Sequence, residues 1–545
     1  MASRGLRTSL AIALFAALLV PPAGAAVTAS DLMPATRTSS QPAQGPRYYP
    51  EFTYERLYVE MRDGVELAVD LWRPVTPKGV EVPVILTLTP YRVLNRALDV
   101  NETDLPNDDA KLFVPKGYAY ARADVRGTYG SGGCWDYGGI KERHDGYDLV
   151  EWFGTREWSN GKVAMTGGSY DGTTANAAAI ERPPHLATIV PVSAISRWWG
   201  YAYQQGTRST YSGESVDIDP PSDTPTDFMF GYGFLPPPNP SDLSRPDQIA
   251  MRWDMCDRDE KFLKGYSTEP DYDDFWIERD YLRKADKVDV PVLVAHGLLD
   301  FNVKTWEGTA WFQALNTEKI LVAGQWPHAN PRTYWPGWNL LLERWFERWL
   351  YGVRNGVENE PAVQVQSSDG QWYTGERWGE GQKRTFGLGE GEATFLDDGA
   401  LTETEMLRGP ASDRFVRVDL EDAKDLRLQG RPILRLRASS DAPSTHFVAV
   451  LAVVAPNGSL RVISRAFMNA RYRDSLAKGE DLEPGRAYDL RLEFIDKDFV
   501  VADDHHLALF IASSSNTWVA PDENRATNTI DLSRSRLELR LARTS

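Results

Sequence analysis

Cysteine and histidine are both scarce in this chain. Its 545 residues include two cysteines, Cys134 and Cys256, and seven histidines, with no Cys/His cluster and no H-E-x-x-H motif. The sequence therefore predicts neither a metal site nor another cofactor. In an exported protein two cysteines favour one disulfide, here between Cys134 and Cys256, although two buried thiols or a catalytic cysteine would also fit.

Positive charge is in deficit as well. The formal net charge is −17, with 60 Lys and Arg against 77 Asp and Glu. Nucleic-acid binding needs a basic surface, so this balance argues against a nucleic-acid partner. After the N-terminal region no segment has the roughly 18 unbroken apolar residues of a transmembrane helix, and we expect no membrane span. The hydrophobic content of 42% and the charged content of 25% are ordinary for a globular protein.

The N-terminal segment has the three parts of a secretory signal peptide. These are two arginines, a short apolar stretch and a small-residue cleavage site (Arg4 and Arg7, Leu10 to Val20, and Ala23-Gly24-Ala25). We expect residues 1–25 to be removed near Ala25 and the mature protein to be secreted. Residues 26–50, rich in Ala, Ser, Thr and Pro, are predicted to be a flexible lead-in.

From residue 51 the pattern predicts an α/β fold. Short apolar runs alternate with helix-like stretches, which favours a parallel sheet with helices on both faces. The expected strands are residues 82–88, 118–124, 162–166, 290–296 and 320–323, and the expected helices are 146–153, 173–180 and 338–351. The last helix carries Leu, Trp and Phe at helical spacing, which indicates a packing surface.

Two changes of pattern divide the chain further. Residues 196–286 are rich in Pro, Asp, Tyr and Trp and are predicted to be a cap of loops and short helices, inserted between core segments 51–195 and 287–354. After residue 355 apolar residues alternate with polar ones, as in Leu537, Leu539 and Leu541. This period of two predicts an all-β domain over 355–545, a sandwich or jelly roll.

The strongest local signal for chemistry lies at Ser169. A predicted strand runs through Gly167 and Gly168 into Ser169, and a predicted helix follows. This is the context of a nucleophile elbow, where a tight turn lifts a serine hydroxyl above the sheet edge. The spacing is unusual because the glycine after the serine is Gly172, which gives G-x-S-Y-x-G. A serine between glycines can also be an ordinary turn.

A serine nucleophile needs a base, and the base needs an acid that orients it. In α/β-hydrolase folds the chain order is Ser, acid, His. Asp300 follows the predicted strand at 290–296, and His328 follows the one at 320–323. Ser169, Asp300 and His328 are therefore the predicted catalytic triad. His296 competes with His328 but precedes the acid, and we interpret it as a buried strand-end histidine.

An acyl-transfer site also needs two donors for the oxyanion. The backbone N–H of Tyr170, directly after the nucleophile, is the expected first donor. The loop after an early strand should supply the second, and Tyr91 lies there. Position alone also allows Tyr91 to be an ordinary loop aromatic.

Several motifs together resemble one family, the Xaa-Pro dipeptidyl-peptidases with the cocaine-esterase-like (CocE/NonD) serine hydrolases. The matching segments are spread along the chain: Pro90-Tyr91, Asp124 to Thr128, Asp145 to Asp148, Glu151-Trp152, Trp158 to Val163, the elbow Gly167 to Gly172, Tyr272 to Trp276, His296 to Lys304 and Asn469-Ala470-Arg471. The resemblance implies an α/β-hydrolase core, a helical cap and a C-terminal jelly roll. It also implies a tyrosine hydroxyl in the oxyanion hole, which falls on Tyr91.

The resemblance implies an acyl-enzyme mechanism and favours peptides with proline second from the N-terminus. An esterase or amide (β-lactam) acylase of the cocaine-esterase type is the alternative, and a non-catalytic binding protein is a rival from another class. Capturing a free N-terminal ammonium favours cap carboxylates, although the same residues also fit a solvated acidic surface. The candidates are Glu214, Asp217, Asp219, Asp273 and Asp274, with Trp276 as a further pocket residue.

Overall fold

The computed structural model describes residues 46–91, 105–209, 270–409, 412–522 and 524–542. The predicted signal peptide, most of the predicted cap and Cys256 lie outside the described residues. In the described part of the chain no helix combines the length and apolar character needed to span a bilayer.

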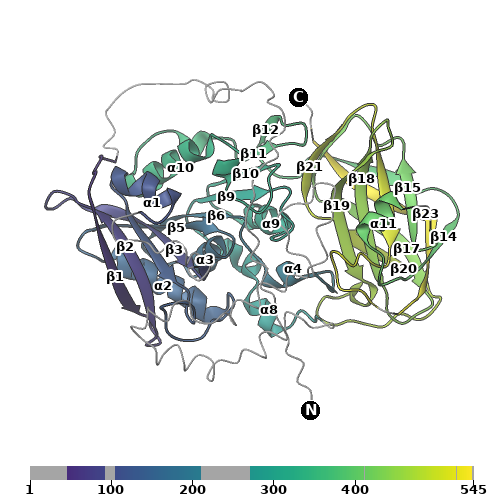
Figure 1. Cartoon of the computed structure of the whole chain (residues 1–545), viewed down its shortest axis with the longest axis horizontal. Helices are drawn as coiled ribbons and strands as arrows, with labels where there is room; N and C mark the ends of the chain where they lie inside the picture. Colours follow the sequence, from purple (N-terminus) through teal and green to yellow (C-terminus); the bar gives the residue numbers. More distant parts are fainter. Residues whose placement is uncertain (1–45, 92–104, 210–269, 410–411, 523, 543–545) are drawn as a thin grey trace, which may run out of the picture. The chain divides into compact units, whose positions relative to one another are not determined.

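A ten-stranded mixed sheet forms the first half of the fold (Figure 1). Its strand order is β1-β2-β4-β3-β5-β6-β9-β10-β11-β12. Strands β4 to β11 in this order run parallel, and only the edge pairs β1–β2, β2–β4 and β11–β12 are antiparallel. The strands are β1 Phe52–Glu60, β2 Glu66–Pro74, β3 Val82–Thr89, β4 Ala119–Asp124, β5 Ser159–Gly168, β6 Leu186–Val192, β9 Val292–Gly297, β10 Lys319–Gly324, β11 Val363–Gln366 and β12 Trp372–Gly375.

Helices cover both faces of this sheet, which explains the unbroken apolar runs in its central strands. In β3, Val84 and Leu86 join one apolar cluster and Ile85 joins another on the opposite face. The first cluster includes residues of α2 (Ile140–Gly154), α3 (Tyr170–Ala179) and α9 (Trp306–Ala314). The second includes residues of α1 (Asp108–Phe113) and α10 (Trp338–Phe346), whose last turn continues as a π-helix over Glu347–Tyr351.

The described part of the cap region is short. It consists of α4 (Trp198–Ala202), the two-stranded β7 (Tyr203–Gln204) and β8 (Thr207–Arg208), α8 (Asp274–Glu278) and a 3-10 helix at Tyr281–Lys287. The cap as an insertion over residues 196–286 stays a prediction.

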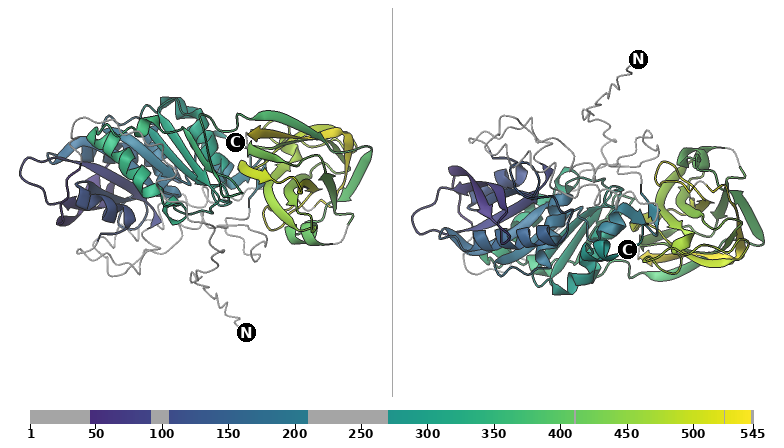
Figure 2. Two further views of the ribbon diagram at one scale, coloured as in Figure 1. Left: turned by 90° about the horizontal axis from the view of Figure 1, so that it is seen from above. Right: turned by 90° about the horizontal axis from the view of Figure 1, so that it is seen from below.

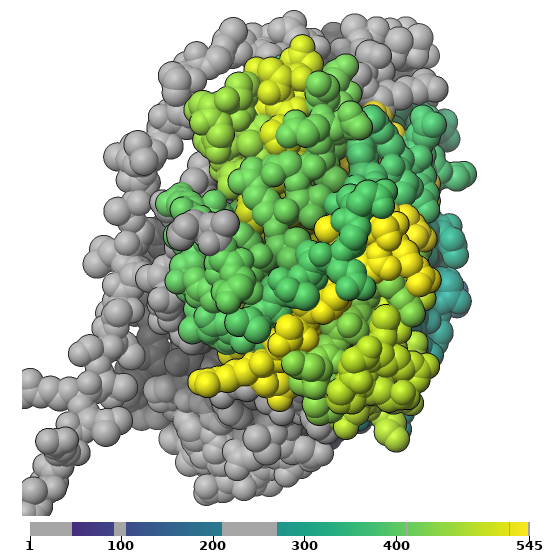
Figure 3. All heavy atoms as spheres, turned by 90° about the vertical axis from the view of Figure 1, so that its right-hand side faces the viewer, coloured from purple at the N-terminus to yellow at the C-terminus, as the bar shows by residue number. Residues whose placement is uncertain are grey.

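The C-terminal domain is a sandwich of two antiparallel sheets (Figure 2; Figure 3 looks onto its residues, coloured green to yellow). One sheet has the order β20-β17-β23-β16-β21, with β13 and β14 also paired to β23, and the other is β15-β22-β18-β19. The strands are β13 Gln382–Gly387, β14 Glu392–Leu396, β15 Phe415–Leu420, β16 Leu426–Gly430, β17 Ile433–Ser440, β18 His446–Val454, β19 Leu460–Asn469, β20 Tyr488–Glu493, β21 Lys497–Val501, β22 His506–Ala512 and β23 Thr527–Ala542. A six-residue helix, α11 (Glu403–Arg408), precedes β15.

The predicted period of two is visible in this sandwich. Alternate residues of β17 are buried, and Leu434 and Leu436 share a core cluster with Phe447 and Leu451 of the facing sheet. The α/β-hydrolase core with a C-terminal all-β domain is thus confirmed. The large sheet continues past residue 354, however, because β11 adds parallel to β10 and β12 follows it.

Candidate active site

Ser169 lies in a strained turn between β5 and α3. Its backbone has φ +60° and ψ −122°, a region that non-glycine residues rarely adopt and that commonly marks functional sites. The Ser169 N–H donates to the Val192 carbonyl at 2.8 Å, which ties the turn to β6. The structure therefore places Ser169 in the predicted nucleophile elbow.

The two outer glycines of the motif are required by close packing. A Cβ at Gly167 would lie 2.3 Å from the Cβ of Asp171, and one at Gly172 would lie 2.7 Å from the Gly167 carbonyl oxygen. The turn thus brings Gly167 and Gly172 together, which explains why the second glycine stands three residues after the serine. At Gly168, by contrast, a Cβ would meet nothing within 4 Å.

This difference gives a matched pair of variants. We expect Gly172→Ala to lower the free energy of unfolding by about 1–3 kcal/mol, because the added methyl group overpacks a rigid turn. It should also lower activity by displacing Ser169. Gly168→Ala, one residue from the nucleophile, should leave the melting temperature unchanged. Thermal unfolding of both variants is the measurement, and equal melting temperatures would contradict this account of the turn.

The two expected oxyanion donors converge beside the nucleophile. The Tyr91 hydroxyl donates to Ser169 Oγ at 2.9 Å. The Tyr170 N–H in turn donates to the Tyr91 hydroxyl oxygen at 3.1 Å. A substrate oxygen placed between these groups would receive hydrogen bonds from both the phenol and the N–H.

A neighbouring residue holds Tyr91 in place. The Tyr91 N–H donates to Thr89 Oγ1 at 3.1 Å. Burial raises the pKa of Tyr91 well above its usual range, and the nearby Asp171 raises it further, so the phenol keeps the proton that it donates. Burial also raises the pKa of the Asp171 carboxyl to about 7.

Asp300 and His328 form the predicted acid–base pair. Asp300 follows β9 and is completely buried. Its Oδ2 lies 2.7 Å from His328 Nδ1, and its Oδ1 accepts the Val303 N–H at 2.9 Å. His328 follows β10 and its side chain is 14% exposed, so its ring is open to the site on one side. An imidazole oriented in this way presents Nε2 for proton transfer.

His296 is not arranged as a base. Its Nε2 donates to the Val303 carbonyl oxygen at 2.8 Å, and the ring is completely buried against Gly308. Burial lowers the pKa of His296. The neutral ring therefore braces the loop that carries Asp300, which agrees with its interpretation as a buried strand-end histidine.

Two buried lysines also hold the acid loop. Lys304 ends the motif His296 to Lys304 noted in the sequence, whereas the sequence did not single out Lys497. Lys497 of β21 donates its Nζ to the Leu298 carbonyl. Lys304 donates its Nζ to the Tyr201 carbonyl at 2.6 Å, and burial lowers its pKa to about 8. The C-terminal domain is therefore part of the support for Asp300.

The Tyr170 side chain points away from the oxyanion and into the core. Its hydroxyl donates to Glu142 Oε2 at 2.7 Å and accepts from Trp135 Nε1 at 2.6 Å. Glu142 is only 2% exposed, and burial raises its pKa to about 7. This network fixes the residue whose N–H faces the oxyanion.

The raised pKa of Glu142 predicts a pH-dependent stability. The folded protein holds a proton that the unfolded chain, with an ordinary pKa of 4.5, releases. Stability therefore falls as pH rises from 4.5 to about 7 and stays lower above that range. Across this window the stability of wild type relative to Glu142→Gln should fall by about 3 kcal/mol. Urea unfolding of wild type and Glu142→Gln at a pH below and a pH above the window measures this fall. Glu390→Gln, at an exposed glutamate, is the control. A difference in stability between wild type and Glu142→Gln that does not change with pH would contradict the prediction.

The remaining predicted residues are not brought to the triad by any described contact. Asp273 caps α8 by accepting the Phe275 N–H at 3.1 Å, Asp274 is exposed, and Trp276 is 1% exposed in the core. Glu214, Asp217, Asp219 and Cys256 lie outside the described residues. The cap carboxylates as an ammonium site and the Cys134–Cys256 disulfide stay predictions. Among the residues that the structure describes, no group of three or more His, Cys, Asp or Glu could hold a metal ion.

Two family profiles match this chain. Residues 63–330 match the family described as X-Pro dipeptidyl-peptidase (S15 family). Residues 355–544 match its C-terminal non-catalytic domain. The first match spans most of the predicted core and the whole of the predicted cap, and the second spans the predicted all-β domain except its last residue.

Relatives extend over nearly the whole chain. A Streptomyces avermitilis protein provisionally named Xaa-Pro dipeptidyl-peptidase is 28% identical over an alignment of 616 positions that covers 94% of this chain and 87% of that protein. The Xaa-Pro dipeptidyl-peptidase of Lactobacillus helveticus is 23% identical over an alignment of 600 positions that covers 87% of this chain and 74% of that one.

Solved structures show the same fold at low identity. A CocE/NonD family hydrolase from Staphylococcus aureus has a TM-score of 0.72 at 18% identity, covering 90% of this chain and 94% of that one. An α-amino acid ester hydrolase has a TM-score of 0.69 at 20% identity, covering 94% and 100%.

Proposed function

Because the chain belongs to the X-Pro dipeptidyl-peptidase (S15) family of serine hydrolases, we propose that it acts through an acyl-enzyme formed on Ser169. The observation that carries this proposal is the hydrogen bond from the Tyr91 hydroxyl to Ser169 Oγ, with the Tyr170 N–H on the same hydroxyl. An ordinary turn serine does not need a buried phenol that donates to its hydroxyl oxygen and is itself held by a backbone N–H.

In the proposed mechanism each group has one role. His328 takes the proton of the Ser169 hydroxyl as the oxygen attacks the acyl carbon, and Asp300 stabilises the resulting imidazolium. Tyr91 and the Tyr170 N–H donate to the oxyanion. The carbon–nitrogen bond then breaks, and His328 returns the proton to the leaving amine. Water, deprotonated by His328, attacks the acyl group and regenerates Ser169.

The substrate in this proposal is a peptide with proline second from its N-terminus. The supporting observations are the two family matches and the names of the relatives. The test is hydrolysis of Ala-Pro-p-nitroanilide beside its N-acetyl form and p-nitrophenyl butyrate, with Ser169→Ala as control. We expect rapid cleavage of the free-amine anilide and loss of cleavage on acetylation. Turnover of the butyrate alone would overturn the peptide substrate and leave an esterase.

Export is the second part of the proposal. The supporting observation is the signal-peptide pattern of residues 1–25, which lie outside the described residues. N-terminal sequencing of protein collected from the medium of a secreting bacterial host should begin at or close to Ala26. An uncleaved chain that stays in the cells would contradict this part and leave the catalytic proposal intact.

A further inference from the structure

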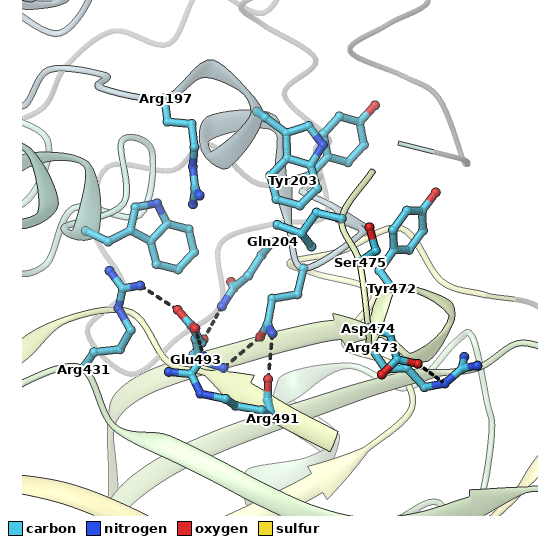
Figure 4. Close-up of a pocket in the computed structure, with 14 residues that line it drawn as sticks. Arg197, Tyr203, Gln204, Arg431, Tyr472, Arg473, Asp474, Ser475, Arg491 and Glu493 are labelled. Atoms are coloured by element: carbon cyan, nitrogen blue, oxygen red, sulfur yellow. Dashed lines mark hydrogen bonds and ion pairs between the residues drawn. The ribbon is translucent and has the colours of Figure 1, made fainter. Parts of the chain in front are cut away.

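A cavity separate from the triad lies between the segment after β6 and the C-terminal domain (Figure 4). Its volume is about 260 Å³, below the range of drug-sized pockets and sufficient for an amino acid or a dipeptide. None of Ser169, Asp300, His328 and Tyr91 lines it.

The walls of this cavity are preformed. Four aromatic side chains, each at most 5% exposed, line it: Trp199, Tyr203, Trp306 and Tyr472. Hydrogen bonds between the two domains fix its floor. Gln204 Nε2 donates to the Glu493 carbonyl at 2.7 Å, and the Glu493 N–H donates to Gln205 Oε1 at 2.8 Å. A ligand would therefore meet rigid apolar surfaces at little cost in ordering.

Positive charge exceeds negative charge around the cavity. The lining holds four arginines and two carboxylates: Arg197, Arg431, Arg473 and Arg491 with Asp474 and Glu493. Three of the arginines are already paired. Arg431 contacts Glu493 and Asp496, each at 2.7 Å, Arg491 also contacts Glu493, and Arg473 contacts Asp474 at 3.2 Å.

Arg197 is the cation that lacks such a partner among the described residues. In Figure 4 its guanidinium points into the cavity, and its Nε is buried without a hydrogen bond. The nearby carboxylate of Glu307 is occupied elsewhere, because it accepts the Ser196 and Arg197 N–H groups, the Ser196 hydroxyl and the Trp306 indole N–H. A buried donor on a charged group is costly unless a ligand or water satisfies it.

The same cavity also holds a buried hydrogen-bond acceptor that receives no hydrogen bond. Gln204 is 3% exposed, and its Oε1 is buried without a hydrogen bond, although its Nε2 is used. The cavity thus offers one charged donor and one neutral acceptor between aromatic walls.

From this arrangement we infer that the cavity binds a small ligand with a carboxylate and an N–H donor, an amino acid or a dipeptide. The carboxylate pairs with Arg197, the ammonium donates to Gln204 Oε1, and the side chain packs on Trp199 and Trp306. The inference does not depend on Ser169 being catalytic. If the protein releases dipeptides, the ligand class includes its own product.

The test is calorimetric titration of the full chain with the dipeptide Ala-Pro and with its amide, which lacks the carboxylate. We expect Ala-Pro to bind, and Arg197→Gln to weaken binding by about tenfold or more, because a charge-assisted hydrogen bond is lost. Arg197→Lys, which keeps the charge, should recover part of the affinity. Arg377→Gln, at an exposed arginine outside the cavity, is the matched control and should bind like wild type.

Three outcomes would overturn the inference: no binding of Ala-Pro to wild type, equal affinity in Arg197→Gln, or equal affinity of the amide and the free acid. The amide comparison uses wild type only, so it decides the question even where Arg197→Gln fails to fold. Ala-Pro is titrated as a ligand and no turnover is measured, so a failure here is distinct from a failure to cleave peptides.

Discussion

Replacing Ser169 by alanine is expected to lower kcat by about 10⁴–10⁶-fold toward every substrate that the protein turns over. The reason is that Ser169 Oγ, in the strained elbow, is the proposed attacking atom and accepts the hydrogen bond of the Tyr91 hydroxyl. Stopped assays with p-nitrophenyl butyrate and Ala-Pro-p-nitroanilide measure the loss.

The control for this variant compares the loss of kcat in the single variants with the loss in the double variant. If Ser169 and His328 act as one unit, His328→Ala should cost about as much as Ser169→Ala, and the double variant no more than either single one. Losses that multiply would contradict a shared step. Near-full activity in Ser169→Ala would remove the nucleophile assignment altogether.

Tyr91→Phe is expected to lower kcat by about 10²–10³-fold with little change in KM, because the phenol donates to an oxyanion that exists only in the transition state. The ring stays, and only the hydroxyl that bonds Ser169 Oγ is lost. Steady-state kinetics measure the split between kcat and KM.

Tyr351→Phe is the matched control for Tyr91→Phe. Its hydroxyl also makes a hydrogen bond, to the Gly117 carbonyl at 2.6 Å, and it belongs to the turn after α10 rather than to the site. It should keep full kcat. A Tyr91→Phe enzyme as active as this control would mean that the oxyanion is held by other donors.

The sequence predicted the triad because order along the chain carries that information. In a parallel sheet the ends of the strands that precede Ser169, Asp300 and His328 lie at one edge, so the strand order brings three separate loops to that edge. From position alone the prediction for Tyr91 was weaker, since an aromatic residue in a loop can have many roles. The resemblance pointed to it, and the contact at 2.9 Å agrees.

Contacts between segments far apart in the chain could not be predicted from the sequence. Lys497 bonds a carbonyl 199 residues before it, and nothing in the sequence around it marks this lysine as buried. Glu142 lies in a helix with charged neighbours, and a sequence of this kind predicts a surface residue. Tertiary packing nevertheless buries it under Tyr170. Period and composition predict which face of an element is buried, but not which polar side chain is buried by a partner elsewhere in the chain.

For a similar reason, the sequence did not show that the large sheet continues to β11 and β12. Strands β11 and β12 are four residues each, which is too short for a period of two to separate them from the all-β domain that follows. Only their pairing assigns them, since β11 hydrogen-bonds to β10 at the edge of the first sheet.

The central claim is that Ser169 becomes covalently acylated, and labelling tests it most directly. The protein is treated with a fluorophosphonate probe, digested and mapped by mass spectrometry, beside Ser169→Ala. The account predicts one adduct, on the peptide that contains Ser169, with no adduct in the variant. An adduct on another residue, or an active wild-type protein that does not react, would contradict it.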